Sequence, residues 1–251
     1  MRVAVAGASG TAGSRIRAEL ERRGHEVRAL SRNSGSHPVD LLTGEGLDAA
    51  LESCDAVVDA TNAGPSPRAA RALLVDGCGR LLRAEAAAGV AHHVCLSIVG
   101  IERVPTGYYR VKVEQEATLA GAGVPHTIVR ATQFHDLLDT AFGSLARIGI
   151  LPRVAAPLQP VDPAEVAGCI ADVVEAGKGR ARATTSVVGP EIRSIAELGA
   201  AWKLARGSRA VRVPFPLVGR VGSGLRGGGL TDPDADRRGE LTFEGWLEAG
   251  S

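Results

Sequence analysis

The chain has 251 residues, of which 45% are hydrophobic and 23% charged, values typical of a soluble globular protein. This length suits one α/β domain with a small appendage. The composition excludes the disordered and fibrous classes of protein. The 29 basic and 28 acidic residues give a formal net charge of +1 and are spread along the chain. Nucleic-acid and membrane-surface binding therefore have no support from charge.

The cysteines are far apart, form no Cys-x-x-Cys pair and lie in mostly apolar surroundings, so we expect reduced, buried thiols at Cys54, Cys78, Cys95 and Cys169. The first predicted strand begins at the N-terminus, which leaves no room for a signal peptide, and no stretch reaches the length of a membrane span. We expect a cytoplasmic protein. The abundance of alanine, glycine and arginine over lysine suggests a bacterial source with a GC-rich genome.

A glycine turn stands between the apolar run Val3–Ala6 and a helix-forming stretch, Ser14–Arg23. A strand, a glycine turn and a helix in this order can hold a pyrophosphate at the free N–H groups of the helix N-terminus. The first glycine allows the turn, the second allows close approach of phosphate, and the third allows close packing of helix on strand. A glycine-rich turn with no ligand is the alternative. We favour dinucleotide binding at Gly7, Ser9, Gly10, Thr11, Ala12 and Gly13.

The second predicted strand, Glu26–Leu30, ends in Ser31-Arg32-Asn33, where an NAD-selective site usually carries an acidic residue. Arg32 can bind a ribose 2′-phosphate instead, which favours NADP(H) over NAD(H). The alternative is a solvated arginine at a strand end.

Strands and helices alternate along the rest of the first 130 residues. The pattern predicts a helix from Arg68 to Ala88, capped by Ser66 and ended by Gly89. It indicates an α/β fold with a doubly wound parallel sheet, the Rossmann type, and a ligand at the carboxyl ends of the strands. The other predicted elements are a possible short strand at 38–41, a helix within 41–53, strands Asp55–Ala60, His93–Ser97 and Pro125–Arg130, and a helix Tyr108–Ala120.

The pattern loosens after Arg130. Helices are predicted near Asp136–Ile148, Pro163–Glu175 and, as the last one, Ser194–Arg206. The six glycines of 219–229 are too many for a regular element and favour a loop. We expect one NAD(P)-binding domain over residues 1–251, in which 131–251 contributes a small C-terminal, less regular substrate-binding region.

Two residues at the start of a predicted helix, Tyr108 and Lys112, are four apart and share one helix face. An ammonium near a phenol stabilises the phenolate and lowers its pKa, so Tyr108 could exchange a proton with a carbonyl oxygen. Lys112 would also bind the nicotinamide ribose. Ser97, at the end of the preceding strand, could donate a second hydrogen bond to the same oxygen. The alternative is an aromatic residue at a helix start beside a solvated lysine.

These motifs resemble the atypical short-chain dehydrogenase/reductases, and within them the NmrA-like NAD(P)-binding proteins. The resemblance covers Met1 to about Val174 and rests on the glycine turn, Ser31-Arg32-Asn33, Ser97, Tyr108–Lys112, 128–134 and 159–167. It implies NADP across the sheet with Arg32 at the 2′-phosphate. It further implies Asp40 and Leu41 near the adenine, Ala60, Thr61 and Asn62 on the nicotinamide side, and Ala131, Gln133 and Phe134 near nicotinamide and substrate.

We therefore expect an NADP-dependent oxidoreductase that reduces a carbonyl or a conjugated double bond of a small organic molecule. An epimerase or isomerase without net redox change, and a non-catalytic NADP(H)-sensing protein, are the alternatives. No metal site is expected, because His92 and His93 point to opposite faces of a strand and cannot bind one metal together. The partner is a small-molecule substrate, and the oligomeric state is left open.

Overall fold

A computed structural model describes residues 1–32, 34, 37–64, 66–177 and 183–250. Contacts within the chain divide it into two compact units. Unit 1 comprises Met1–Ser97, Gly107–Arg130 and Pro163–Thr185, and unit 2 comprises Ile98–Thr106, Ala131–Asp162 and the chain from Ser186 onward. Asn33, which the sequence analysis named, lies outside the described residues.

The central sheet has the strand order β11-β8-β5-β4-β3-β1-β2. β1 pairs in parallel with both β2 and β3, and β3 pairs in parallel with β4. The residues of β1 after the first are fully buried because helices cover both faces of a parallel sheet. The predicted Rossmann-type sheet is confirmed. Its strands are β1 (Arg2–Ala6), β2 (Glu26–Leu30), β3 (Ala56–Asp59), β4 (His92–Ile98), β5 (His126–Ala131), β8 (Ala183–Val188) and β11 (Arg237–Arg238).

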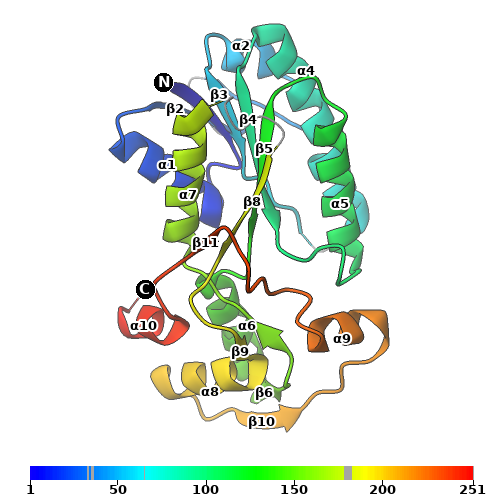
Figure 1. Cartoon of the computed structure of the whole chain (residues 1–251), viewed down its shortest axis with the longest axis vertical. Helices are drawn as coiled ribbons and strands as arrows, with labels where there is room; N and C mark the ends of the chain where they lie inside the picture. Colours follow the sequence, from blue (N-terminus) through cyan, green and yellow to red (C-terminus); the bar gives the residue numbers. More distant parts are fainter. Residues whose placement is uncertain (33, 35–36, 65, 178–182, 251) are drawn as a thin grey trace. The chain divides into compact units, whose positions relative to one another are not determined.

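In unit 1, α1 (Thr11–Arg22) and α7 (Pro163–Ala176) lie together on one face of the sheet, and α4 (Cys78–Ala88) and α5 (Gly107–Ala120) lie on the other (Figure 1). This double layer is what the alternating pattern predicts. The carboxyl ends of β1, β3 and β4 meet at one edge of the sheet, because these strands are parallel.

The helix predicted from Arg68 to Ala88 is present but interrupted. It consists of α3 (Pro67–Arg71), a π-helical turn (Ala72–Gly77) and α4. The Ser66 side chain accepts a hydrogen bond from Ala69 N, and Gly89 ends α4 with a φ of +72°, so both predicted ends are confirmed. The predicted short strand at 38–41 is wrong, since this segment forms only two isolated bridges. The helix expected within 41–53 is α2 (Leu47–Leu51).

Unit 2 combines short strands with four helices in its described part. An aromatic cluster holds it together, since Phe142 contacts both Trp202 and Phe243, and Phe243 stacks on Trp246. Its elements outside the central sheet are α6 (His135–Arg147), β6 (Ile150–Arg153), β7 (Pro157–Leu158), β9 (Arg193–Ser194), α8 (Ile195–Ala205), β10 (Val211–Pro214), α9 (Gly219–Arg226) and α10 (Phe243–Glu248).

The expectation of a loop over 219–229 is wrong, because α9 occupies Gly219–Arg226. A Cβ on Gly224 would lie 2.4 Å from the carbonyl oxygen of Arg103, and one on Gly222 would lie 2.8 Å from that of Leu217. These glycines allow close backbone packing and do not signal an irregular chain. The helix after Ser194 is also not the last one, since α10 follows it.

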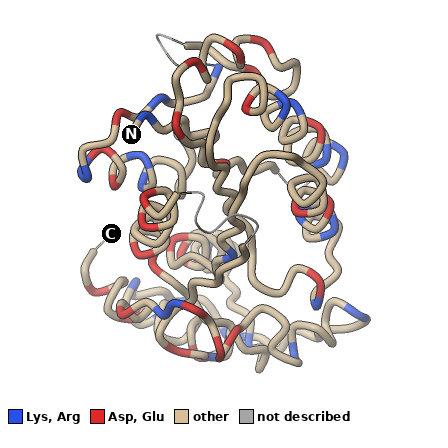
Figure 2. Tube along the Cα trace, turned by 45° about the horizontal axis from the view of Figure 1, so that its top comes forward, with Lys and Arg blue, Asp and Glu red and all other residues tan. Residues whose placement is uncertain are grey.

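Basic and acidic residues are interspersed along the trace (Figure 2), in keeping with the near-zero net charge. In the part of the chain that is described, no helix is long and apolar enough to cross a membrane.

Candidate functional site

The glycine turn after β1 needs two of its glycines for steric reasons. Gly7 has a φ of +76°, and a Cβ there would lie 2.6 Å from the carbonyl oxygen of Ala60. A Cβ on Gly13 would lie 2.1 Å from the carbonyl oxygen of Gly7. The structure thus agrees with the roles given to the first and third glycines, in the turn and in helix packing.

The first turn of α1 is open to an anion. Gly10 is the N-cap and has no side chain with which to cap the helix, and the first turn carries no acidic residue. Ser9, Gly10 and Thr11 are exposed. N–H groups at such a helix start carry partial positive charge and suit a phosphate.

The predicted adenine end is built from the segment after β2. Arg32 is exposed in the turn that follows this strand. Asp40 Oδ1 accepts a hydrogen bond from Leu42 N (2.8 Å), while Leu41 is buried. Exposure leaves the Arg32 guanidinium accessible to a phosphate in solution.

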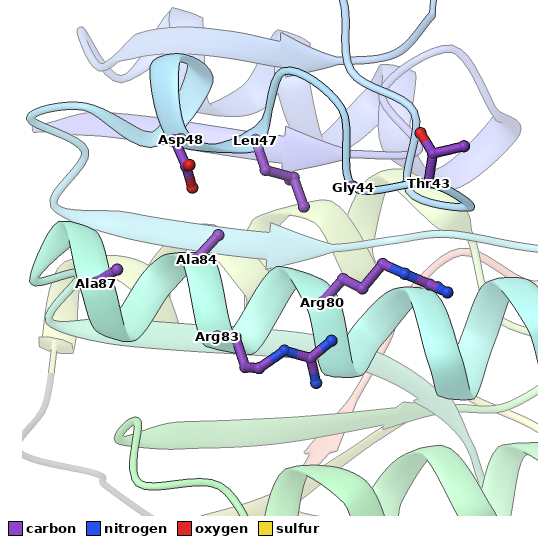
Figure 3. Close-up of a pocket in the computed structure, with 8 residues that line it drawn as sticks. All are labelled: Thr43, Gly44, Leu47, Asp48, Arg80, Arg83, Ala84 and Ala87. Carbon is purple, nitrogen blue, oxygen red and sulfur yellow. The ribbon is translucent and has the colours of Figure 1, made fainter.

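A shallow pocket of about 330 Å³ lies between the segment 43–48 and α4 (Figure 3). Arg80 crosses toward this segment and donates to the carbonyl of Leu41. The predicted cofactor residues are not among those that line the pocket, which are Thr43, Gly44, Leu47, Asp48, Arg80, Arg83, Ala84 and Ala87.

Asp59 organises the segment predicted to lie beside the nicotinamide. Its Oδ1 accepts hydrogen bonds from Thr61 N (3.0 Å) and Thr61 Oγ1 (2.6 Å). The next residue, Asn62, accepts a hydrogen bond from Tyr108 Oη at 2.7 Å. Tyr108 is therefore at the strand edge where the cofactor residues were predicted.

Lys112 is 2% exposed and takes part in a buried chain of hydrogen bonds. Its Nζ donates to the carbonyl of Leu96 (2.9 Å) and to Gln115 Oε1 (2.6 Å), and Gln115 Nε2 donates to Asp59 Oδ2 (3.0 Å). Lys112 is thereby linked, through Gln115 and Asp59, to Thr61. The sequence analysis missed Gln115 and Asp59, although Gln115 is three residues after Lys112 on α5 and Asp59 is a charged residue ending an apolar strand.

The three predicted catalytic residues have different partners. Ser97 is buried and its hydroxyl donates to Glu116 Oε1 at 2.6 Å. The pKa of Tyr108 is raised to about 12, chiefly by burial and then by the neighbouring Tyr109, Asp59 and Cys95. This is a correction to one expectation, because a lowered pKa through Lys112 was predicted. The catalytic roles themselves stay predictions.

The remaining predicted cofactor residues belong to unit 2. Ala131 is buried at the end of β5, and Phe134 precedes α6 as its N-cap. Gln133 Nε2 donates to the carbonyl of Leu230 (3.0 Å), and its Oε1 accepts from Gln159 N (3.1 Å). The Gln133 amide is thus fixed at both ends within unit 2.

The two adjacent histidines of β4 bind different partners. His92 Nε2 contacts Thr127 Oγ1 (2.9 Å), whereas His93 Nδ1 contacts Glu85 Oε1 (2.8 Å). This agrees with opposite orientations on a strand. All four cysteines are buried, as predicted.

A family model described as NAD(P)H-binding matches residues 7–176. Among curated proteins, no sequence matches the chain. The matched range includes the glycine turn, Arg32, Ser97, Tyr108 and Lys112, and it confirms the predicted membership of an NAD(P)-binding family.

Several solved structures share the fold. An NADPH-dependent quinone oxidoreductase from Escherichia coli, complexed with NADPH, has a TM-score of 0.81 and 16% identity, with 98% of this chain and 99% of that chain covered. A Citrobacter sp. triphenylmethane reductase complexed with NADP(H) has a TM-score of 0.79 and 17% identity, covering 99% and 100%. A nucleoside-diphosphate-sugar epimerase from Staphylococcus aureus has the same score, identity and coverage as the second.

Proposed function

This chain belongs to the NAD(P)H-binding family, and from that premise we propose that it is an NADP-dependent reductase of a carbonyl or conjugated double bond in a small organic molecule. The observation that carries the proposal is the glycine turn before α1. Gly7 and Gly13 admit no Cβ there, and the first turn of α1 is open to a phosphate.

In the proposed binding mode, NADPH lies along the carboxyl edge of the sheet. The pyrophosphate would lie at the glycine turn, the 2′-phosphate at Arg32, and the nicotinamide beside the segment Ala60–Asn62. When bound, NADPH supplies the hydride for reduction. The exposed Arg32 guanidinium supports the preference for NADP(H), because an arginine binds a phosphate with charge-assisted hydrogen bonds.

The residues of the chain orient the reaction. Lys112, Gln115 and Asp59 hold the Thr61 segment in place, and Tyr108 is a neutral phenol at pH 7, with a pKa raised further above the ordinary value by burial. In the proposed role, the Tyr108 hydroxyl leaves Asn62 and donates a hydrogen bond to the oxygen of the acceptor, while solvent supplies the proton that accompanies the hydride. Ser97 would have to leave its bond to Glu116 to contact a substrate.

Two of the solved neighbours guide the choice of acceptors to test. A quinone is named for one of them and a triphenylmethane for the other. Nothing beyond the fold is carried over at these identities, so the acceptor is a proposal to be tested directly.

The test is NADPH consumption by the purified chain with a panel of quinones, conjugated dyes and simple carbonyl compounds. We expect turnover with at least one acceptor, and faster turnover with NADPH than with NADH. Binding of NADPH without consumption of it by any acceptor would contradict the reductase and would favour a sensor or an epimerase.

The cofactor preference is tested with Arg32→Ala. A charge-assisted contact is worth about 1.5–3 kcal/mol, so the ratio of the NADH to the NADPH dissociation constant should fall roughly 10- to 100-fold. Arg17→Ala, which removes an exposed arginine from α1, is the matched control and should leave the ratio unchanged. An unchanged ratio in Arg32→Ala would remove the assignment of Arg32 to the 2′-phosphate.

A further inference from the structure

A second cluster of polar side chains lies inside unit 1, on β3 and β4. In the parallel register Asp59 pairs with Cys95, and His93 precedes Cys95 by two residues. Residues two apart on a strand point to the same face, so His93 and Cys95 share one face of the sheet. Asp59, His93 and Cys95 are all at most 2% exposed, and one ligand atom from each lies within 4.8 Å of the others.

The imidazole of His93 is oriented as in a metal ligand. Its Nδ1 lies 2.8 Å and 3.0 Å from the two carboxylate oxygens of the buried Glu85. That contact leaves Nε2 as the second ring nitrogen. Among the described residues Nε2 has no hydrogen-bond partner of normal geometry, and the His93 side chain interacts with Cys95 as well as with Glu85. Metal-bound histidines usually donate their other ring N–H to a carboxylate in this way. A buried Nε2 without a partner is otherwise costly.

The second and third ligands are also oriented. The Asp59 carboxylate is fixed by hydrogen bonds from Thr61 and Gln115. Its Oδ1 accepts two of them, whereas Oδ2 accepts one and has capacity for a further contact. Cys95 is buried in an apolar cluster between β4 and α4, which keeps its sulfur on the side of Asp59 and His93.

The geometry points to a zinc site formed by Asp59, His93 and Cys95. Thiolate, imidazole and carboxylate are the ligands of Zn²⁺ in proteins, and a water molecule completes four-coordination where the protein supplies three ligands. Coordination requires the Cys95 sulfur as a thiolate, so Zn²⁺ enters as the thiol proton leaves. Because the site is buried, the ion would be taken up during folding and would stabilise the folded state. This inference goes beyond the proposed reduction and does not depend on it.

The first test is the metal content of the full-length protein, purified from cells grown with added Zn²⁺ and washed with a chelator. We expect one zinc per chain in the wild type and its loss in Cys95→Ala. Cys54→Ala removes a buried cysteine that contacts Ala50 and should keep the zinc. A wild-type protein with no more zinc than Cys95→Ala would overturn the proposal.

Cys95→Ala could fail to fold, so a second measurement uses only the wild type, produced in cells grown with Co²⁺. We expect a thiolate-to-cobalt charge-transfer band and the intense visible bands of tetrahedral Co²⁺ in the purified, folded protein. A folded protein without these bands and without zinc would also overturn the proposal. Neither readout requires NADPH, so a failure here is distinct from a failure of the proposed function.

Discussion

Tyr108 has a hydroxyl that reaches Asn62 and a phenol whose pKa burial raises to about 12. Its neighbour Tyr109 also has a pKa above the ordinary value because it is buried. The raised pKa extends the range of pH in which the phenol is neutral and can donate a hydrogen bond to well above pH 10. These are the only two tyrosines of the chain, so their ionisation can be measured without other tyrosines contributing.

We predict that the tyrosinate absorbance of the folded protein stays at baseline up to about pH 10, the ordinary phenol pKa, and rises only above it. The measurement is a spectrophotometric pH titration, with the denatured protein as the reference for ionisation near pH 10. Assignment uses Tyr108→Phe, with Tyr109→Phe as the matched control. An ionisation below pH 9 that is absent in Tyr108→Phe would contradict this prediction. It would support the original hypothesis that Lys112 lowers the pKa of Tyr108.

The glycine turn after β1 could be predicted because its signal is local. A glycine that tolerates no Cβ, such as Gly13, leaves its mark in the sequence as a glycine. The partners of Lys112 could not be predicted in this way. Gln115 and Asp59 meet across α5 and β3, 56 residues apart in the chain, and only the fold brings them together.

At the scale of elements, the glycines between β1 and α1 serve two different purposes. Gly13 is needed for packing, whereas Gly10 is proposed to leave room for a ligand. A Cβ on Gly10 would lie 3.3 Å from the carbonyl oxygen of Gly7, and Gly10 has a φ of −78°, which alanine adopts readily. We predict that Gly10→Ala folds but binds NADPH at least about tenfold more weakly, because the methyl group occupies the path of the pyrophosphate.

Gly13→Ala should instead lose stability, by about 3 kcal/mol or more, since its Cβ would overlap the Gly7 carbonyl. Gly123→Ala, where a Cβ meets no atom within 4 Å, is the control for both variants. Thermal denaturation and NADPH titration give the two readouts. Wild-type affinity in Gly10→Ala would show that phosphate does not approach this backbone.

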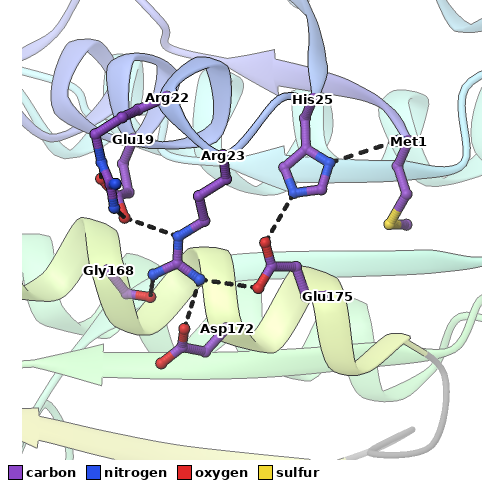
Figure 4. A network of polar contacts seen from close by, with 8 residues as sticks. All are labelled: Met1, Glu19, Arg22, Arg23, His25, Gly168, Asp172 and Glu175. Atoms are coloured by element: carbon purple, nitrogen blue, oxygen red, sulfur yellow. Dashed lines mark hydrogen bonds and ion pairs between the residues drawn. The ribbon is translucent and has the colours of Figure 1, made fainter.

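The packing of α1 on α7 depends on Arg23 (Figure 4). Its guanidinium binds Glu19 (2.7 Å), Asp172 (2.6 Å), Glu175 (2.9 Å) and the carbonyl of Gly168 (3.2 Å). Arg22 binds the same Glu19 but its side chain is 69% exposed. The two arginines together hold the pKa of Glu19 at about 2.

We predict that Arg23→Gln lowers the free energy of unfolding by about 2 kcal/mol at pH 7, because it breaks several charge-assisted hydrogen bonds. Arg22→Gln is the matched control and should lower the free energy of unfolding clearly less, because the Arg22 side chain is exposed to solvent. The ionised Glu19 stabilises the fold above the ordinary pKa of 4.5, and this contribution is lost as pH falls toward 2.

The difference in the free energy of unfolding between Arg23→Gln and the wild type should therefore become smaller as the pH falls from 4.5 toward 2. Denaturant unfolding at several pH values measures this difference. Equal losses in the two arginine variants would show that the contacts of Arg23 with α7 contribute nothing.

At the scale of the whole molecule, the sequence predicts unit 1 better than unit 2. In unit 1 the strands are apolar runs separated by helices of regular period, so β1, β2, β3 and α5 fall within a few residues of their predicted bounds. The interruption of the helix at Ala72–Gly77 carried no such signal.

The elements of unit 2 were harder to predict from the sequence, for a physical reason. Its strands β7, β9 and β11 have two residues each, too few for any periodicity to show. In α9, Gly224 serves close packing against Arg103, which is 121 residues away in the chain. A local pattern of glycines predicts a loop, because it carries no information on this distant contact.

The central claim is that the turn between β1 and α1 binds the pyrophosphate of a nicotinamide dinucleotide. It is tested most directly by calorimetric titration of NADPH into the folded wild-type chain, with Gly10→Ala measured alongside. The account predicts a saturable heat of binding at one site per chain, much weakened in Gly10→Ala and weaker for NADH. The absence of any heat of binding with NADPH, NADP⁺, NADH and NAD⁺ would contradict it.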